Sequence, residues 1–128
     1  MLILASILVL GCTSQNPANN SGEKIKVVFE ISANDKTSTV IVFADANSNA
    51  FEAMKSNLKV DYKDSVMGPF ITGINNIKSD SGHYWALYVD GEYAQKGISL
   101  YALEKDTNIS WKLEKIGSIF QTTTDSEI

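Results

Sequence analysis

The sequence has one cysteine, one histidine, two prolines and no excess of positive charge. Its 128 residues include 11 Lys or Arg and 15 Asp or Glu, which gives a formal net charge of -4. A single cysteine cannot form a disulfide within the chain. An acidic chain has no electrostatic attraction for a phosphate backbone. The sequence therefore excludes a scaffold held by internal disulfides and argues against nucleic acid as a partner.

Residues that commonly carry catalysis are also scarce. The only histidine, His83, has no serine, cysteine or carboxylate at a spacing that defines a known catalytic site. A lone histidine beside a strand is most often structural. The eight glycines form neither a dinucleotide-binding fingerprint nor a phosphate loop. We therefore expect a protein that is not an enzyme and that carries no cofactor.

No apolar run reaches the roughly 20 residues that a membrane-spanning helix needs. The run at the start, MLILASILVLGC, has the length of the apolar part of a signal peptide. Its end, Val9-Leu10-Gly11-Cys12, resembles the lipobox of prokaryotic lipoproteins, in which the cysteine is lipidated after cleavage. The resemblance implies a signal peptide over residues 1–11 and a lipid anchor on Cys12 that holds the protein at the extracellular face of the cell membrane. The alternative is that Cys12 is an ordinary buried thiol.

One small domain lies between two polar segments. Residues 12–24, interrupted by Pro17 and Gly22, predict a flexible tether. The tail 121–128 is polar and predicts disorder. The remaining residues 25–120 suffice for a single core, and the content of 44% hydrophobic and 20% charged residues is typical of a globular protein.

The first half of this domain predicts a hairpin followed by a helix. IKVVFEI from Ile25 alternates apolar and polar residues, and TSTVIVFAD follows after the turn signal Asn34-Asp35. Phe51, Met54 and Leu58 then recur at helical spacing. Three polar residues before them are candidate helix caps, namely Asp45, Asn47 and Ser48.

Short strands predominate in the second half. LKVDYK places Leu58, Val60 and Tyr62 on one side, and GPFITGINNI and NISWKLEKI are further extended segments. An early hairpin, one helix and later strands that complete a mixed sheet predict an α+β domain with a β-grasp-like arrangement.

The stretch YWALYVDGEY places four aromatic residues around Asp90-Gly91, a strong two-residue hairpin signal. Alternation directs Trp85, Leu87 and Val89 to one face, and Tyr84, Ala86 and Tyr88 to the other. One face must cover the core. The tyrosine face has two interpretations: an aromatic ladder across the strands that shields the sheet, or a surface that meets a ligand or a partner.

The segment DANSNAFEAMKS begins like a calcium-binding loop, with Asp45, Asn47 and Asn49 at the first, third and fifth positions. Such a loop also needs a glycine at the sixth position and a glutamate at the twelfth, where this chain has Ala50 and Ser56. Helix capping explains the same polar residues. We therefore expect no metal site.

The segment from Gly68 to Lys115 resembles the C-terminal β-domain of transcobalamin and intrinsic factor, and the related extracellular domains of the DUF4430 type. The matching residues are Phe70-Ile71, Gly73-Ile74-Asn75, Tyr84-Trp85, Asp90-Gly91-Glu92-Tyr93-Ala94, Gly97-Ile98, Tyr101 and the last strand from Asn108 to Leu113. The resemblance implies a β-grasp-type fold that binds a soluble ligand. In transcobalamin this module closes over one face of cobalamin.

The ligand-binding residues that we expect combine this resemblance with the tyrosine face. They are Phe70, Ile71, Tyr84, Trp85, Tyr88, Gly97, Ile98 and Tyr101. The implied function is non-catalytic capture of a soluble ligand, cobalamin or another corrinoid, by a membrane-anchored extracellular lipoprotein. The alternative is a surface module for protein–protein interaction or adhesion, without a small-molecule ligand.

Overall fold

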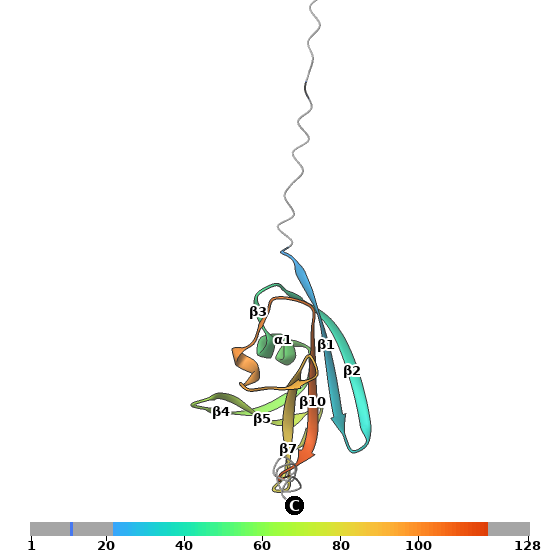
Figure 1. Ribbon diagram of the computed structural model, residues 1–128, viewed down its shortest axis with the longest axis vertical. Helices are drawn as coiled ribbons and strands as arrows, with labels where there is room; N and C mark the ends of the chain where they lie inside the picture. The colour runs from blue at the N-terminus through green and yellow to red at the C-terminus, as the bar shows by residue number, and fades with distance from the viewer. Residues whose placement is uncertain (1–10, 12–21, 118–128) are drawn as a thin grey trace, which may run out of the picture.

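The computed structural model describes Gly11 and residues 22–117. The expected lipidation site Cys12, nearly all of the expected signal peptide, most of the tether and the tail lie outside the described residues. Most of the described part is β-strand, arranged in three sheets beside one α-helix (Figure 1); the largest sheet is mixed and the two smaller ones are antiparallel. That helix, α1 (Ala50–Asn57), has eight residues, and no helix in the described part is long and apolar enough to cross a membrane.

Strands β1 (Lys24–Ala33) and β2 (Lys36–Asp45) form the predicted hairpin, paired without a register break. Apolar side chains at every second position of β1 are buried, from Ile25 to Ala33. The turn residues Asn34 and Asp35 have φ angles of 52° and 60°. Positive φ at both central residues gives the turn whose twist matches that of the strands, and short polar residues tolerate it best.

The main sheet has the order β2-β1-β10-β7-β8. It includes β7 (His83–Val89), β8 (Glu92–Tyr93) and β10 (Thr107–Lys115). The first strand and the last strand lie side by side and parallel at its centre, where Ile31 is paired with Trp111. Strand β10 is antiparallel to β7, and Trp111 is paired with Leu87. This register places the apolar residues of three strands in rows on one face.

Helix α1 begins after Asn49, whose Oδ1 accepts hydrogen bonds from the backbone N–H of Phe51 at 2.9 Å and of Glu52 at 3.3 Å. The prediction that Asp45, Asn47 or Ser48 caps the helix is wrong. Ser48 and Asn49 form the short strand β3 (Ser48–Asn49), which is paired with β9 (Ala102–Leu103), so the helix starts only at Ala50.

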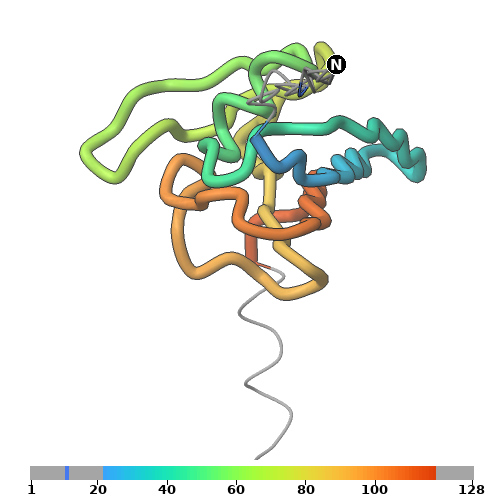
Figure 2. The backbone as a smooth tube through the Cα atoms, turned by 90° about the horizontal axis from the view of Figure 1, so that it is seen from above, coloured from blue at the N-terminus to red at the C-terminus, as the bar shows by residue number. Residues whose placement is uncertain are grey.

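A three-stranded sheet lies beside the helix: β4 (Val60–Ser65), β5 (Gly68–Ile74) and β6 (Ile77–Lys78). A register shift between Asp61 and Tyr62 interrupts the expected alternation, so Tyr62 is exposed. Leu58 caps the end of α1 instead of starting the strand. The β4–β5 hairpin projects from the body of the molecule on the side away from the β1–β2 hairpin (Figure 2).

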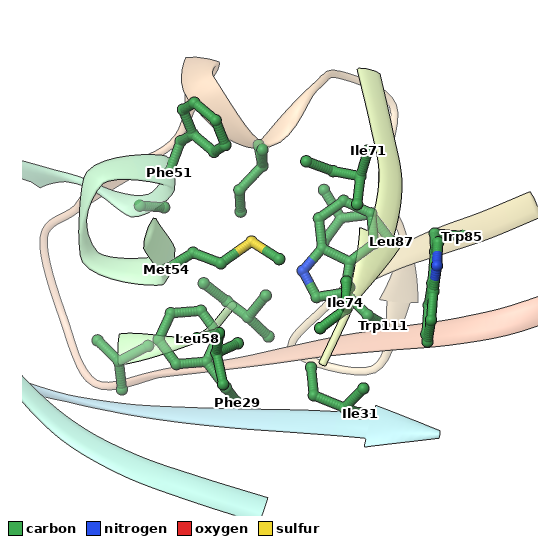
Figure 3. Close-up of a cluster of buried hydrophobic side chains, with 14 of the residues drawn as sticks. Phe29, Ile31, Phe51, Met54, Leu58, Ile71, Ile74, Trp85, Leu87 and Trp111 are labelled. Atoms are coloured by element: carbon green, nitrogen blue, oxygen red, sulfur yellow. The ribbon is translucent and has the colours of Figure 1, made fainter. Parts of the chain in front are cut away.

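The core lies between α1, β5 and the inner face of the main sheet (Figure 3). Met54 is completely buried and points from α1 towards the indole of Trp111. The short 3-10 helix η1 (Ile98–Leu100) closes this core through Ile98, which is 1% exposed. Phe51, Met54 and Leu58, expected at helical spacing, are buried. Of the residues that alternation places on one face of β7, Trp85 and Leu87 are buried and Val89 is partly buried.

Candidate functional site

A hollow of about 210 Å³ lies along the first half of β7, and we call it the β7 hollow. Strand β8 is paired only with Tyr88 and Val89. Strand β5 and the segment after Tyr93 lie opposite the rest of β7, with the Ala94 N–H donating to the Leu87 carbonyl at 2.9 Å. The residues that line the hollow are Pro69, Phe70, Ile71, Tyr84, Trp85, Leu87, Tyr93, Ala94, Lys96, Gly97, Ile98 and Trp111.

Both tryptophans of the chain line this hollow. Trp85 and Trp111 are 5% and 4% exposed and come from neighbouring strands of the same sheet face. The indole Nε1 of Trp85 donates a 3.1 Å hydrogen bond to the carbonyl of Ile77, which holds the orientation of the ring. The two indoles therefore contribute a large apolar surface to the hollow, and only that of Trp85 is held by a hydrogen bond, since the buried Nε1 of Trp111 has no partner among the described residues.

Six of the eight expected ligand-binding residues meet at the β7 hollow. They are Phe70, Ile71, Tyr84, Trp85, Gly97 and Ile98. Strand β5 supplies the first two, β7 the next two, and η1 with its cap the last two. Phe70 is 57% exposed, whereas Ile71 is 4% exposed, so Phe70 is the apolar side chain of β5 that a ligand can reach.

Tyr88 does not line the hollow, because it lies on the outer face of the main sheet. Its hydroxyl donates to Glu114 Oε1 at 2.7 Å, and its ring packs edge-on against Tyr93 with centroids 5.5 Å apart. The Lys112 Nζ lies 4.4 Å from the centre of the Tyr88 ring. The hydrogen bond to Glu114, together with burial, raises the pKa of Tyr88 to about 12. Tyr88 therefore belongs to an aromatic pair across the strands.

Tyr84 belongs both to the hollow and to this outer cluster. It lines the β7 hollow, and its hydroxyl lies 3.4 Å from Glu114 Oε2. Burial first, and then the hydroxyl of Tyr93 and the charge of Glu114, raise the pKa of Tyr84 well above its usual range. Tyr84 thus remains neutral and can offer a ring edge and a hydroxyl to the hollow.

Tyr101 lines a separate hollow of about 210 Å³, beside Val89, Leu103 and Ile109. It follows η1 as its cap, and its ring lies 4.4 Å from the ammonium of Lys96. Tyr101 therefore does not line the β7 hollow, but it contacts Lys96, which does.

A wider groove of about 640 Å³ adjoins the β7 hollow, and we call it the hairpin groove. The turn of the β4–β5 hairpin forms one side, where Val66 and Met67 are fully or largely exposed. Leu100, 61% exposed, contributes from η1. The residues shared by the hollow and the groove are Pro69, Phe70, Ala94, Lys96 and Gly97. Together the two depressions present a largely apolar surface, and exposed apolar patches on monomeric proteins mark interaction sites.

The site also contains residues that sequence reasoning did not select. They are Pro69, Leu87, Tyr93, Ala94, Lys96 and Trp111. Alternation identifies Trp111 as an inward residue, but only the register of β10 against β7 shows that it shares a face with Trp85. Lys96 directly precedes Gly97, one of the expected ligand-binding residues, and this adjacency is the sequence signal that could have identified it.

The calcium-like segment is engaged in other contacts. The Asn49 side chain caps α1, and the Asp45 carboxylate forms an ion pair with Lys24.

Asp80 accepts a 2.9 Å hydrogen bond from His83, and that bond lowers the pKa of the Asp80 carboxyl. Within Gly11 and residues 22–117, no three His, Cys, Asp or Glu side chains gather to hold a metal.

Residues 47–115 match the family described as Domain of unknown function (DUF4430). This match covers more than half of the chain and includes every residue of the β7 hollow and the hairpin groove. No curated protein matches the sequence.

Two solved structures show a similar fold. A proposed metal-binding protein from Ruminococcus gnavus ATCC 29149 is 18% identical, with a TM-score of 0.65, and the match covers 71% of this chain and 97% of that protein. Haptocorrin in complex with Cbi is 23% identical, with a TM-score of 0.64, and the match covers 82% of this chain. The match spans only 28% of haptocorrin, so this chain corresponds to less than a third of that protein.

Proposed function

The chain belongs to the DUF4430 family, and from that membership and the geometry of the site we propose that it binds a soluble ligand at the β7 hollow and the hairpin groove. The ligand lays an apolar face against Phe70, Trp85 and the exposed side chains of the β4–β5 turn. One observation carries the proposal: six residues selected from the sequence, on three separate elements, converge on one apolar depression.

A corrinoid is the ligand class to test first. The support comes from haptocorrin, which is solved with Cbi and is similar to this chain over most of the described part. Ordinary ligand pockets have volumes of roughly 300 to 1,000 Å³, whereas the β7 hollow has about 210 Å³. A large ligand would therefore rest on this surface and extend over the hairpin groove, leaving its other face uncovered by the described residues.

Binding without catalysis is part of the proposal. Apart from Gln95 and Lys96, the hollow and the groove are lined by aromatic, aliphatic and small residues, and no carboxylate or imidazole of the described part lines them. We also propose that the protein is a lipoprotein anchored through Cys12 at the extracellular face of the membrane. The support for this anchor is the lipobox-like Val9-Leu10-Gly11-Cys12.

The fold itself is proposed to be a variant of the β-grasp. Three features support this proposal: the hairpin comes first, the helix follows it, and the first strand pairs in parallel with the last at the centre of the sheet. The three-stranded β4-β5-β6 sheet would be an insertion that supplies one wall of the site.

A protein partner is the second candidate, favoured by the full exposure of Val66 and the large exposure of Met67. Side chains of this kind at the tip of a projecting hairpin suit contact with another polypeptide. This proposal predicts that replacing both residues with serine abolishes capture of a membrane protein.

Titration of the full chain with cobalamin and with cobinamide tests the first proposal. Tryptophan fluorescence is the readout, because both tryptophans line the β7 hollow; the visible spectrum of the corrin is the second readout. We expect saturable quenching that Phe70→Ala weakens and that Phe43→Ala, at an exposed position on β2, leaves unchanged. If neither spectrum changes at high ligand concentration, the chain alone is not a corrinoid binder.

A further inference from the structure

The β7 hollow and the hairpin groove contain a single charged side chain, Lys96, which lines both. The whole chain is acidic, with 15 carboxylate residues against 11 Lys or Arg. A surface patch with the average composition of this chain would carry more carboxylates than Lys or Arg side chains. The local charge of the site is therefore opposite in sign to that of the whole protein.

Lys96 is held at the boundary between the two depressions. Its ammonium lies 4.4 Å from the centre of the Tyr101 ring, a cation–π contact that favours a defined position. Backbone hydrogen bonds hold the short segment that carries Lys96 on both sides of this residue. The Ala94 N–H donates to the Leu87 carbonyl at 2.9 Å, and the Gly97 carbonyl accepts from Leu100 N–H at 3.0 Å.

The ammonium of Lys96 remains available to an incoming group. Lys96 is exposed, and it forms no ion pair with a carboxylate among residues 22–117. Aromatic rings such as those of Trp85 and Tyr84 attract cations, so the aromatic lining alone does not favour an anionic ligand. The ammonium of Lys96 at the rim of the site does favour one, because it repels a cation and pairs with an anion.

We propose that the ligand of the β7 hollow is an amphipathic anion, whose carboxylate or phosphate pairs with Lys96 while its apolar part covers Phe70 and Trp85. This inference rests on the proposed ligand binding at the β7 hollow and narrows it: a corrinoid fits only if it presents an anionic group to Lys96, such as the phosphate of cobalamin, which cobinamide lacks. Tyr101 is then a positioning residue: it orients Lys96 and does not touch the apolar part of the ligand.

Two probes of the same shape, one charged and one neutral, test the inference on the full chain. The first, 2-naphthoate, carries a carboxylate, and the second, 2-naphthamide, is neutral and has the same ring. Tryptophan fluorescence reports binding at the hollow. An ion pair at an exposed rim is worth about a twofold to fivefold gain in affinity at low salt, so we expect naphthoate to bind more tightly by that factor.

Four variants separate the charge from the apolar surface. Lys96→Met should remove the preference for naphthoate, Lys96→Arg should retain it, and Lys105→Met, at an exposed lysine that does not line the β7 hollow, should leave it unchanged. Phe70→Ala should weaken both probes equally. Added salt should reduce the preference in the parent protein and have no effect on the binding of naphthamide.

The outcomes distinguish the two levels of the proposal. Equal affinities for the two probes, or a preference that survives Lys96→Met, would overturn the role of Lys96 while the apolar site stands. If neither probe changes the tryptophan signal, both the ligand site and its preference for anions are wrong.

Discussion

The hydroxyl of Tyr88 donates a 2.7 Å hydrogen bond to Glu114 on the neighbouring strand β10. Tyr84, which alternation places on the same face, has its hydroxyl 3.4 Å from the other oxygen of this carboxylate, so both tyrosines share Glu114. Their positions along β7 are what separate them. Tyr88 is held in the outer cluster by Glu114, Tyr93 and Lys112, whereas Tyr84 reaches the β7 hollow. The aromatic stretch of β7 is therefore partly a structural ladder and partly the wall of a site.

Tyr88→Phe should destabilise the protein by about 1 to 2 kcal/mol, because a hydrogen bond to a charged carboxylate is lost and Glu114 is left without that donor. Urea unfolding followed by circular dichroism measures the change. Tyr62→Phe is the matched control: Tyr62 lies at an exposed position on β4, and its ring contact with Phe51 does not involve the hydroxyl. A change below a few tenths of a kcal/mol for Tyr88→Phe would mean that the bond contributes nothing net.

The same bond predicts how stability depends on alkaline pH. The pKa of Tyr88 is raised from 10.0 to about 12, so the unfolded chain releases this proton at lower pH than the folded chain does. The stabilisation is complete below pH 10 and is lost as the pH rises towards 12. Tyr88→Phe should flatten this decline, and should also remove a late component from the ultraviolet titration of tyrosinate. An unchanged titration curve in the variant would contradict the assignment.

Asn49→Ala should cost about 0.5 to 2 kcal/mol, the usual effect of losing a helix cap. Asn49 also donates from Nδ2 to the Ser99 carbonyl at 2.7 Å, which ties α1 to η1. Asn49→Asp keeps the capping oxygen and loses that donor, so its stability should lie between those of the parent protein and the alanine variant. Thermal unfolding of the parent protein and the two variants gives the order of their stabilities. Equal loss in both variants would mean that the bond to Ser99 outweighs the cap.

Met54→Ala should destabilise the protein by about 2 to 5 kcal/mol, because it leaves a cavity next to Trp111 in the core. Met54 is 0% exposed, whereas Met67 in the β4–β5 turn is 83% exposed. The identical substitution at Met67 should therefore alter the free energy of unfolding by less than about 0.5 kcal/mol. Chemical denaturation of both variants provides the comparison, and similar losses at the two positions would contradict the assigned burial.

Local chemistry accounts for the elements that were predicted correctly. Asn34-Asp35 and Asp90-Gly91 both adopt positive φ and close hairpins, as short polar residues and glycine do. Period-two alternation describes the whole buried row of β1. In β7 and β10 it holds for Trp85, Leu87, Ile109 and Trp111, but Ala86 and Ser110, which point the other way, are buried as well. The resemblance to DUF4430 domains is confirmed by the family match. The turn and alternation signals need only neighbours a few residues apart, whereas the family resemblance rests on the order of residues over the whole second half of the domain.

Predictions failed where pairing with another strand decided the outcome. Asn49, rather than Asp45, Asn47 or Ser48, caps α1 because β9, about fifty residues later in the chain, pairs with β3 and delays the start of the helix. Tyr62 leaves the expected alternation because β4 has a register shift in its pairing with β5, the next strand of the same hairpin. Neither pairing can be read from the alternation of a single strand.

By sequence alone, the chain specifies one acidic domain, its hairpins, its single helix and its family, because composition, turn residues and alternation are local properties. Only the tertiary structure decides which aromatic residues form a site. The register of β10 on β7 brings Trp111 beside Trp85, and the short β8 leaves the start of β7 to be covered by β5 and Lys96. Such contacts join residues far apart in the chain, so no local pattern encodes them.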